Sequence, residues 1–194
     1  MAREDEPDRQ EPGQRTGRPA IYLREMDIDD LAAVFHLGEK LFTAEEVPNL
    51  YRTWDEYEVT GLFQTDPELC LVAEDESMGL VVGFALGTTI EKSRSAWKYG
   101  HLIWLGVRPG YQRFGVGSRL FNQLKSRMAE KGVRIILVDT EADNLGALRF
   151  FRDMDFSNPQ EHIYLSLNLE TQKKKNGERQ TNGKSAARGP HSQD

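Results

Sequence analysis

The sequence has almost no cysteine and no long apolar stretch. Its 194 residues include a single cysteine, Cys70, which excludes an internal disulfide and any CxxC metal site, so no metal is predicted. The longest apolar run, residues 80–86, is far shorter than the roughly 20 residues that cross a bilayer. The opening residues MAREDEPDRQ lack the apolar segment of a signal peptide. These absences predict a soluble protein of the reducing cytoplasm.

Hydrophobic residues are also scarce, at 38% of the chain, and the two ends account for the shortage. Residues 1–19 are rich in charge, proline, glycine and glutamine, and residues 170–194 are basic and polar. Neither segment has the apolar side chains that a core needs, so both are predicted to be disordered tails. One domain is expected between them, at residues 20–169.

Acidic residues outnumber basic residues in the predicted domain. The chain has a net charge of −6, of which residues 1–19 contribute −1 and residues 171–194 contribute +4, leaving −9 for the segment between. An acidic body could attract a cationic amine, or it could simply keep the protein soluble. It argues against nucleic-acid binding as the main task, and the lysine run at 173–175 is more typical of a solvated tail than of an RNA contact.

Residues 101–131 are the stretch around which the rest of the chain is organised. Residues 101–107 form an apolar run suited to a strand buried on both faces, and the Arg-Pro-Gly at 108–110 ends it. A loop with two glycines follows and leads directly into a helix, after which Gly132 stands where a helix usually ends. The apolar face of this helix is expected to comprise Val116, Leu120, Phe121, Leu124 and Met128.

A strand, a glycine loop and a helix N-terminus together suit the binding of an anion such as a phosphate. The first amides of a helix point at such a ligand, and glycines at 115 and 117 leave room for it. A tight turn without any ligand would use the same glycines, so the loop alone leaves both interpretations open. It lacks the GK[ST] of a P-loop and the GxGxxG of a dinucleotide-binding turn.

The other segments predict an α/β domain with a mixed sheet. Strands are expected at 21–24, 69–73, 80–90, 133–138 and 163–167, the second and third of them as an antiparallel hairpin and the fourth as a buried strand. Helices are expected from the acidic cluster at 27–30 onward, at 53–63 and at 144–154. Hairpins early in the chain and a crossover helix later imply a mostly antiparallel, twisted sheet with helices on both faces. Inward-facing side chains are expected to include Ile28, Val34, Phe35, Trp54, Tyr57 and Leu62.

Two motifs in this order resemble the GNAT family of N-acetyltransferases. The first is Val107-Arg108-Pro109 followed by Gln112-Arg113-Phe114-Gly115-Val116-Gly117, similar to the family's acetyl-CoA signature. The second runs from Asn144 to Phe156, where Asn144, Ala147, Phe150 and Phe156 match in register. It departs from the family at Phe151, where a Tyr is usual, and at Asp155, where a Gly is usual. The resemblance covers residues 20–169 and implies the GNAT fold.

The resemblance implies an acetyl-CoA site. The amides of Arg113, Phe114, Gly115, Val116, Gly117 and Ser118 would hold the pyrophosphate, with a side-chain contact from Gln112 or Arg113. The backbone of Leu105, Gly106 and Val107 would pair with the pantetheine arm where the central strand parts from its neighbour, and one amide there would stabilise the oxyanion. Asn144 would contact the cofactor while also capping its helix, and Phe151 would lie beside it.

The same resemblance offers two candidates for the general base. Asp139 occupies the place of a strand-end Glu in the ribosomal-protein alanine acetyltransferases, the branch to which the segment 139–144 is weakly closest, and this makes it the favoured candidate. His101 occupies the place of the Glu in the histone-acetylating branch, and imidazole titrates near neutral pH. Because Phe151 has no proton to give, water or Tyr164 would have to protonate the leaving thiolate.

The implied function is transfer of an acetyl group from acetyl-CoA to a primary amine, with a peptide N-terminus or a lysine favoured. A small amine such as a polyamine or aminoglycoside, a longer acyl group, and a non-catalytic acyl-CoA-binding module all stay open, the last because of Phe151. Acetyl-CoA and the amine acceptor are the expected partners, without a membrane. The oligomeric state is undetermined, and a homodimer is compatible with the sequence.

Overall fold

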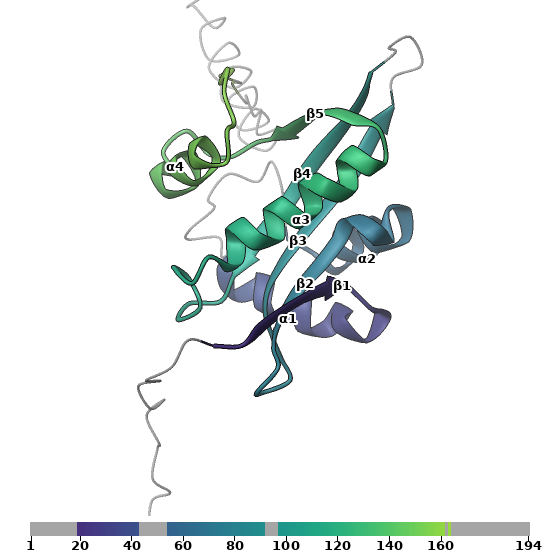
Figure 1. Cartoon of the computed structure of the whole chain (residues 1–194), viewed down its shortest axis with the longest axis vertical. Helices are drawn as coiled ribbons and strands as arrows, with labels where there is room; N and C mark the ends of the chain where they lie inside the picture. Colours follow the sequence, from purple (N-terminus) through teal and green to yellow (C-terminus); the bar gives the residue numbers. More distant parts are fainter. Residues whose placement is uncertain (1–18, 43–53, 92–96, 162, 164–194) are drawn as a thin grey trace, which may run out of the picture. The chain divides into compact units, whose positions relative to one another are not determined.

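The computed structural model describes residues 19–42, 54–91, 97–161 and 163, and the regular elements all fall within residues 1–157, the first of two compact units. Figure 1 shows their arrangement. The strands are β1 (Ile21–Glu25), β2 (Cys70–Asp75), β3 (Leu80–Glu91), β4 (Lys98–Val107) and β5 (Val133–Val138). The helices are α1 (Leu31–Leu41), α2 (Glu56–Thr65), α3 (Val116–Glu130) and α4 (Leu145–Asp153), with short 3₁₀ turns η1 (Ile28–Asp30) and η2 (Pro67–Leu69).

The five strands form one sheet in chain order, β1-β2-β3-β4-β5. The first three pairings are antiparallel, and β4 and β5 are parallel, joined by the crossover helix α3. The predicted mixed, mostly antiparallel sheet is therefore confirmed, as is the β2–β3 hairpin. The closing strand predicted at 163–167 lies outside the described residues, apart from Ile163, which has no regular structure. Both predicted tails lie outside them as well, except residue 19.

Helices cover both faces of the sheet. On one face α3 buries the five side chains that the sequence pattern assigned to its apolar side, against residues such as Leu71, Ala85 and Leu102. On the other face α1 and α2 enclose a second core around Val34, Leu37, Val59, Phe84 and Trp104. Trp54 lies in this second core and donates its indole N–H to the carbonyl of Phe35 at 3.0 Å.

Three sequence-based expectations about burial are wrong. Ile28 is 66% exposed, because the 3₁₀ turn at 28–30 rotates it away from the face that α1 buries. Tyr57 is 79% exposed, since α2 begins only at Glu56 and uses Val59 as its buried contact. The strand β5 was expected to be buried, yet only Val133 is, because β5 lies at the edge of the described sheet.

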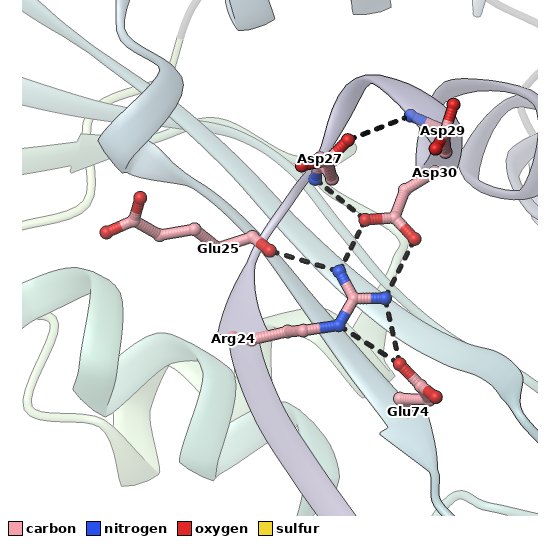
Figure 2. Close-up of polar contacts among 6 residues, drawn as sticks. All are labelled: Arg24, Glu25, Asp27, Asp29, Asp30 and Glu74. Atoms are coloured by element: carbon pink, nitrogen blue, oxygen red, sulfur yellow. Dashed lines mark hydrogen bonds and ion pairs between the residues drawn. The ribbon is translucent and has the colours of Figure 1, made fainter.

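Arg24 ties β1 to its surroundings (Figure 2). Its guanidinium donates to both carboxylate oxygens of Asp30, the longer bond at 2.9 Å, and to Glu74 on β2 at 2.8 and 3.0 Å. Asp30 also accepts from the amide of Asp27, whose own carboxylate caps η1 through the amide of Asp29, as the acidic cluster predicted. This network fixes the start of α1 against the edge of the sheet.

An irregularity in β4 divides the strand into two halves. The β3–β4 register skips Ile103, which marks a bulge, because Leu86 opposes Trp104 while Gly87 opposes Leu102. As a result Ile103 and Trp104 both contact the α1/α2 core, whereas Leu102 and Leu105 contact the α3 core. The bulge bends β4 at the point where the functional site lies.

Candidate functional site

The strands β4 and β5 part immediately before the bulge, and we call this place the fork. Their parallel register runs from Lys98 opposite Val133 to Leu102 opposite Val138 and ends there. Leu105, Gly106 and Val107 continue to pair with β3, but past the fork they have no described strand on their other side. Successive amides of a strand point to opposite edges, so at least one N–H of these three faces the open edge. This is the splay that the sequence resemblance implied.

His101 and Asp139, which the sequence offered as alternative bases, meet at the fork. His101 stands opposite Leu137 in the register, and Asp139 follows the last residue of β5. The imidazole Nε2 lies 2.8 Å from Asp139 Oδ1, with 18% of the His101 side chain and 45% of the Asp139 side chain exposed. Gly100 and Leu102 face α3, so the alternation of a strand places His101 on the opposite face, that of α1 and α2.

The loop from Arg108 to Gly115, which we call the anion loop, connects the end of β4 to α3. Its backbone takes left-handed conformations at Gly110, Arg113 and Gly115, with φ of 88°, 68° and 76°. Gly115 is the N-cap of α3 and supplies no side-chain cap, so the first amides of α3 have no internal partner of that kind. The Gln112 side chain donates to the carbonyl of Val107 at 3.3 Å, which closes the loop on the strand.

The two glycines of the loop are there for different reasons. Gly115 has a positive φ that strains other residues, and this is reason enough for a glycine. Gly117 is helical, and a β-carbon added there would meet Phe150 and Val107 at ordinary contact distances of 3.5 and 3.7 Å. Internal packing therefore does not require Gly117, whereas a phosphate group at the helix N-terminus would. The loop fits the pyrophosphate of CoA.

The start of α4 accounts for Asn144. Its side-chain oxygen accepts from the amide of Ala147 at 3.0 Å, so the residue is an N-cap, as expected. Phe150 lies against α3 near Gly117, which brings α4 beside the anion loop. Phe151 packs against Phe150 and Phe156, with ring centroids 5.3 and 5.4 Å away. Its ring is half-buried among aromatic neighbours. Because the residue is Phe and not the usual Tyr, no hydroxyl is present at this position.

The end of α4 explains the other departure from the family motif. The amide of Phe156 donates to Phe151 O and the amide of Asp155 donates to Arg152 O, which together form a Schellman motif. Asp155 holds the left-handed position of this motif, with φ of 69°. The usual glycine suits that position because it has no β-carbon, and aspartate is among the residues that tolerate it.

Two residues that support the loop were missed in the sequence. Tyr111 is buried and donates its hydroxyl to Asp75 Oδ2 at 2.8 Å, although 36 positions separate them. No local pattern marks such a contact, since it depends on how the hairpin and the loop meet.

Among the described residues no three His, Cys, Asp or Glu side chains are arranged to hold a metal ion. Nor does this part of the chain contain a helix with the length and apolar character to cross a bilayer.

Comparison with known proteins places this geometry in a family. Residues 31–156 match the model of the acetyltransferase (GNAT) family. The fold is similar to Ard1 from Thermoplasma volcanium, with 23% identity, a TM-score of 0.61, and coverage of 73% of this chain and 85% of that one. It is also similar to the aminoglycoside acetyltransferase meta-AAC0020 from an uncultured soil metagenomic sample, solved with sisomicin. That match has 21% identity, a TM-score of 0.60, and coverage of 76% of this chain and 97% of that one.

A third similar structure is the NatC complex bound to Gag peptide and CoA, with 23% identity, a TM-score of 0.58, and coverage of 69% of this chain and 82% of that one. The match to the family model spans the fork, the anion loop and α4, and it includes every regular element described above except β1 and η1. The chain therefore belongs to the acetyltransferase (GNAT) family.

Proposed function

We propose that this protein acetylates the primary amine of a peptide, at its N-terminus or at a lysine, by direct attack on acetyl-CoA. The observation that carries the proposal is the His101–Asp139 pair at the fork, beside backbone amides that have no described strand to bond. The similarity to a complex solved with a peptide and CoA supports a peptide acceptor. The similarity to an aminoglycoside enzyme supports the alternative, a small polyamine or aminoglycoside.

In the proposed reaction the anion loop binds the donor. The amides of residues 113–118 hold the pyrophosphate, and the open edge of Leu105, Gly106 and Val107 pairs with the pantetheine arm. An amide at that edge donates to the thioester oxygen, where negative charge develops as the amine attacks. Asn144 contacts the donor from the start of α4, and Phe151 forms part of the adjoining apolar wall.

The acceptor arrives as an ammonium and must lose a proton before it can attack. We assign this step to His101 and Asp139 acting as a pair. The carboxylate accepts from Nε2–H and so orients the imidazole, which takes the proton from the ammonium. The C–N bond then forms, the nitrogen gives up its second proton to solvent, the C–S bond breaks, and the thiolate leaves. Phe151 cannot protonate it, so we assign that proton to solvent.

Release of free thiol tests the proposal. Purified protein and acetyl-CoA are mixed with peptides carrying a free N-terminus, peptides carrying only lysine, polyamines and aminoglycosides, and the products are identified by mass spectrometry. Fastest thiol release with either peptide class, with one acetyl group on the amine, is the expected result. Fastest release with polyamines or aminoglycosides would overturn the peptide assignment and leave the reaction class intact.

A non-catalytic acyl-CoA-binding module is the second candidate, and Phe151 motivates it because the usual proton donor is absent. Tight CoA binding by calorimetry without thiol release for any amine would favour it. We further propose residues 20–169 as the catalytic unit between two tails, and the reducing cytoplasm as its location, which the single buried cysteine supports.

A further inference from the structure

Asp75 is a buried carboxylate at the end of β2, and the proposed reaction does not use it. It is 0% exposed, whereas aspartate is rarely buried unless it is well bonded. Its Oδ1 accepts from the Ser77 hydroxyl at 2.5 Å and from the Ser77 amide at 3.1 Å, which shapes the β2–β3 turn. Its Oδ2 points to another part of the molecule and accepts from Tyr111 at 2.8 Å. Asp75 therefore joins the hairpin turn to the anion loop.

Tyr111 is the buried side chain in the middle of that loop. Its ring belongs to the α3 core, at 9% exposure, and its amide donates to the carbonyl of Arg108 at 3.0 Å. The amide of Arg108 in turn donates to Val82 O on β3 at 2.8 Å. The first half of the loop is thus fixed to the hairpin by this backbone bond, by a bond from the Arg108 guanidinium to Val81 O at 3.5 Å, and by the Tyr111 hydroxyl, which contacts Asp75 and, more weakly, the Met78 sulfur.

The second half of the loop is the part that meets the anion, and it adopts an unfavourable backbone. Arg113 has φ of 68°, a left-handed conformation that costs a residue with a β-carbon about 1–2 kcal/mol. Such a conformation persists only where the surroundings enforce it. The fixed residue nearest before Arg113 is Tyr111, because Gln112 is bonded only through its exposed side chain. Release of Tyr111 would let the loop relax and would disperse the amides that converge on the anion.

We propose that Asp75, acting through the Tyr111 hydroxyl, is a positioning residue that sets the affinity of the anion loop for CoA. The inference rests on the proposed function for its ligand, since the loop is taken as the pyrophosphate site. In this proposal the β2–β3 turn influences donor binding indirectly, through Tyr111, and not by contact with the donor. A carboxylate with only a structural role would hold the fold together and leave the affinity of the folded protein unchanged.

Tyr111→Phe is the decisive variant, because it removes the hydroxyl and keeps the ring in the core. We expect the Kd for CoA, measured by calorimetry well below the melting temperature, to rise about tenfold, which is a loss of about 1.4 kcal/mol. Thiol release at saturating acetyl-CoA should stay within about twofold, so that KM changes and kcat does not. Tyr22→Phe, the same change on an exposed residue of β1, is the matched control and should leave both values unchanged.

Asp75→Asn and Asp75→Ala distinguish a role of Asp75 in positioning the loop from a role in folding stability alone. The Asn amide can accept from Ser77 and donate to the Tyr111 oxygen, so CoA binding should return to within about threefold of wild type. Asp75→Ala should weaken binding at least as much as Tyr111→Phe; if it does not fold, Tyr111→Phe decides. Wild-type affinity in folded Tyr111→Phe would overturn this inference alone. Failure of the wild-type chain itself to bind CoA would overturn the proposed function and this inference with it.

Discussion

The two edges of β4 differ along the same ten residues. On its β3 edge the strand is paired from Lys98, opposite Glu91, to Val107, opposite Gly83. On its β5 edge the pairing stops at Leu102, so the second half of the strand has no described partner there. One strand thus pairs its backbone with β3 on one side and leaves part of it without a described strand partner on the other, where we propose that the donor binds. The fully paired edge cannot bind a substrate in this way, because its N–H and C=O groups are already used.

Burial follows the same division. On the paired side β2 is buried except at Glu74, β3 is buried from Val81 to Gly87, and their side chains form much of both cores. On the open side Leu137 of β5 is 43% exposed, and none of the nine residues of α4 is fully buried. Apart from Asp75, which bonds to the loop through Tyr111, substitutions on the paired side should therefore change mainly stability, and substitutions at the fork and the loop should change mainly activity.

The largest effect is expected at the fork. His101→Gln should lower kcat by about 10²–10⁴-fold, the usual worth of a general base, with little change in the affinity for acetyl-CoA. Asp139→Asn should lower it less, since the carboxylate only orients the ring, and the double variant should be no worse than His101→Gln because the pair acts as a unit. Steady-state thiol release measures all three.

Lys98→Ala is the control for this prediction, because Lys98 lies on β4 before the fork and pairs only with exposed Glu91. It should leave kcat unchanged. A larger loss for Asp139→Asn than for His101→Gln would make the carboxylate the base by itself, which was the preference from the sequence.

The next effect is expected at the anion loop. Gly117→Val should raise the Kd for CoA at least tenfold, because its side chain would occupy the space of the pyrophosphate. The melting temperature should change little, since the site has room for a β-carbon and the backbone is helical. Gly115→Val is not an equivalent test, because strain at its positive φ would destabilise the fold as well. Normal CoA affinity in Gly117→Val would contradict the proposed pyrophosphate site at the N-terminus of α3.

On the paired side, Arg24→Ala should reduce stability without altering kcat. The substitution leaves Asp30, whose side chain is only 10% exposed, without its ion pair, and lost hydrogen bonds to charged groups cost about 1.5–3 kcal/mol. Denaturant unfolding measures the change. His36→Ala, which breaks an exposed pair with Glu39, should cost well under about 1 kcal/mol. Equal losses in the two variants would contradict the stabilising role of the Arg24 network.

The same network predicts a loss of stability in acid. Burial alone would raise the pKa of Asp30, but hydrogen bonds from Arg24 and from the Asp27 amide outweigh it and lower the pKa below its ordinary value of 3.8. The ionised form is therefore favoured by folding, so its contribution is complete above pH 3.8 and is lost as pH falls through the lowered value. Unfolding measured from pH 5 downward should show this slope in wild type and a weaker one in Arg24→Ala.

The smallest effect is expected at the end of α4, on the open side. Asp155→Gly should stabilise the protein by about 1 kcal/mol, because glycine adopts the left-handed conformation without the strain of a β-carbon. Gly132→Ala, at the matching position after α3 with φ of 81°, should cost a similar amount. Thermal unfolding measures both. A neutral Asp155→Gly would mean that the Asp side chain already compensates for the strain.

Features encoded by neighbouring residues could be predicted from the sequence. The five buried residues of α3, the glycine after it and the N-cap at Asn144 follow from spacing within a few residues, and all three are confirmed. The contacts His101–Asp139 and Tyr111–Asp75 could not be predicted, because the first depends on the register of β4 and β5 across 38 positions and the second on how the loop meets the β2–β3 hairpin across 36 positions. Each candidate base could be judged only singly until β4 and β5 were aligned.

Burial of the one cysteine decides how this enzyme can be assayed. Desolvation, reinforced by Asp66 and Glu68, raises the pKa of the Cys70 thiol to about 12. Only about one molecule in 10⁴ would then carry a thiolate at pH 8, and the sulfur is fully buried as well. Aromatic disulfide reagents react with thiolates, so in a mixture with folded protein they titrate the thiol of released CoA and little else. The Cys70 thiol reacts with the reagent only after the protein unfolds. With folded protein the colour therefore measures turnover, and any additional colour measures the fraction of protein that has unfolded.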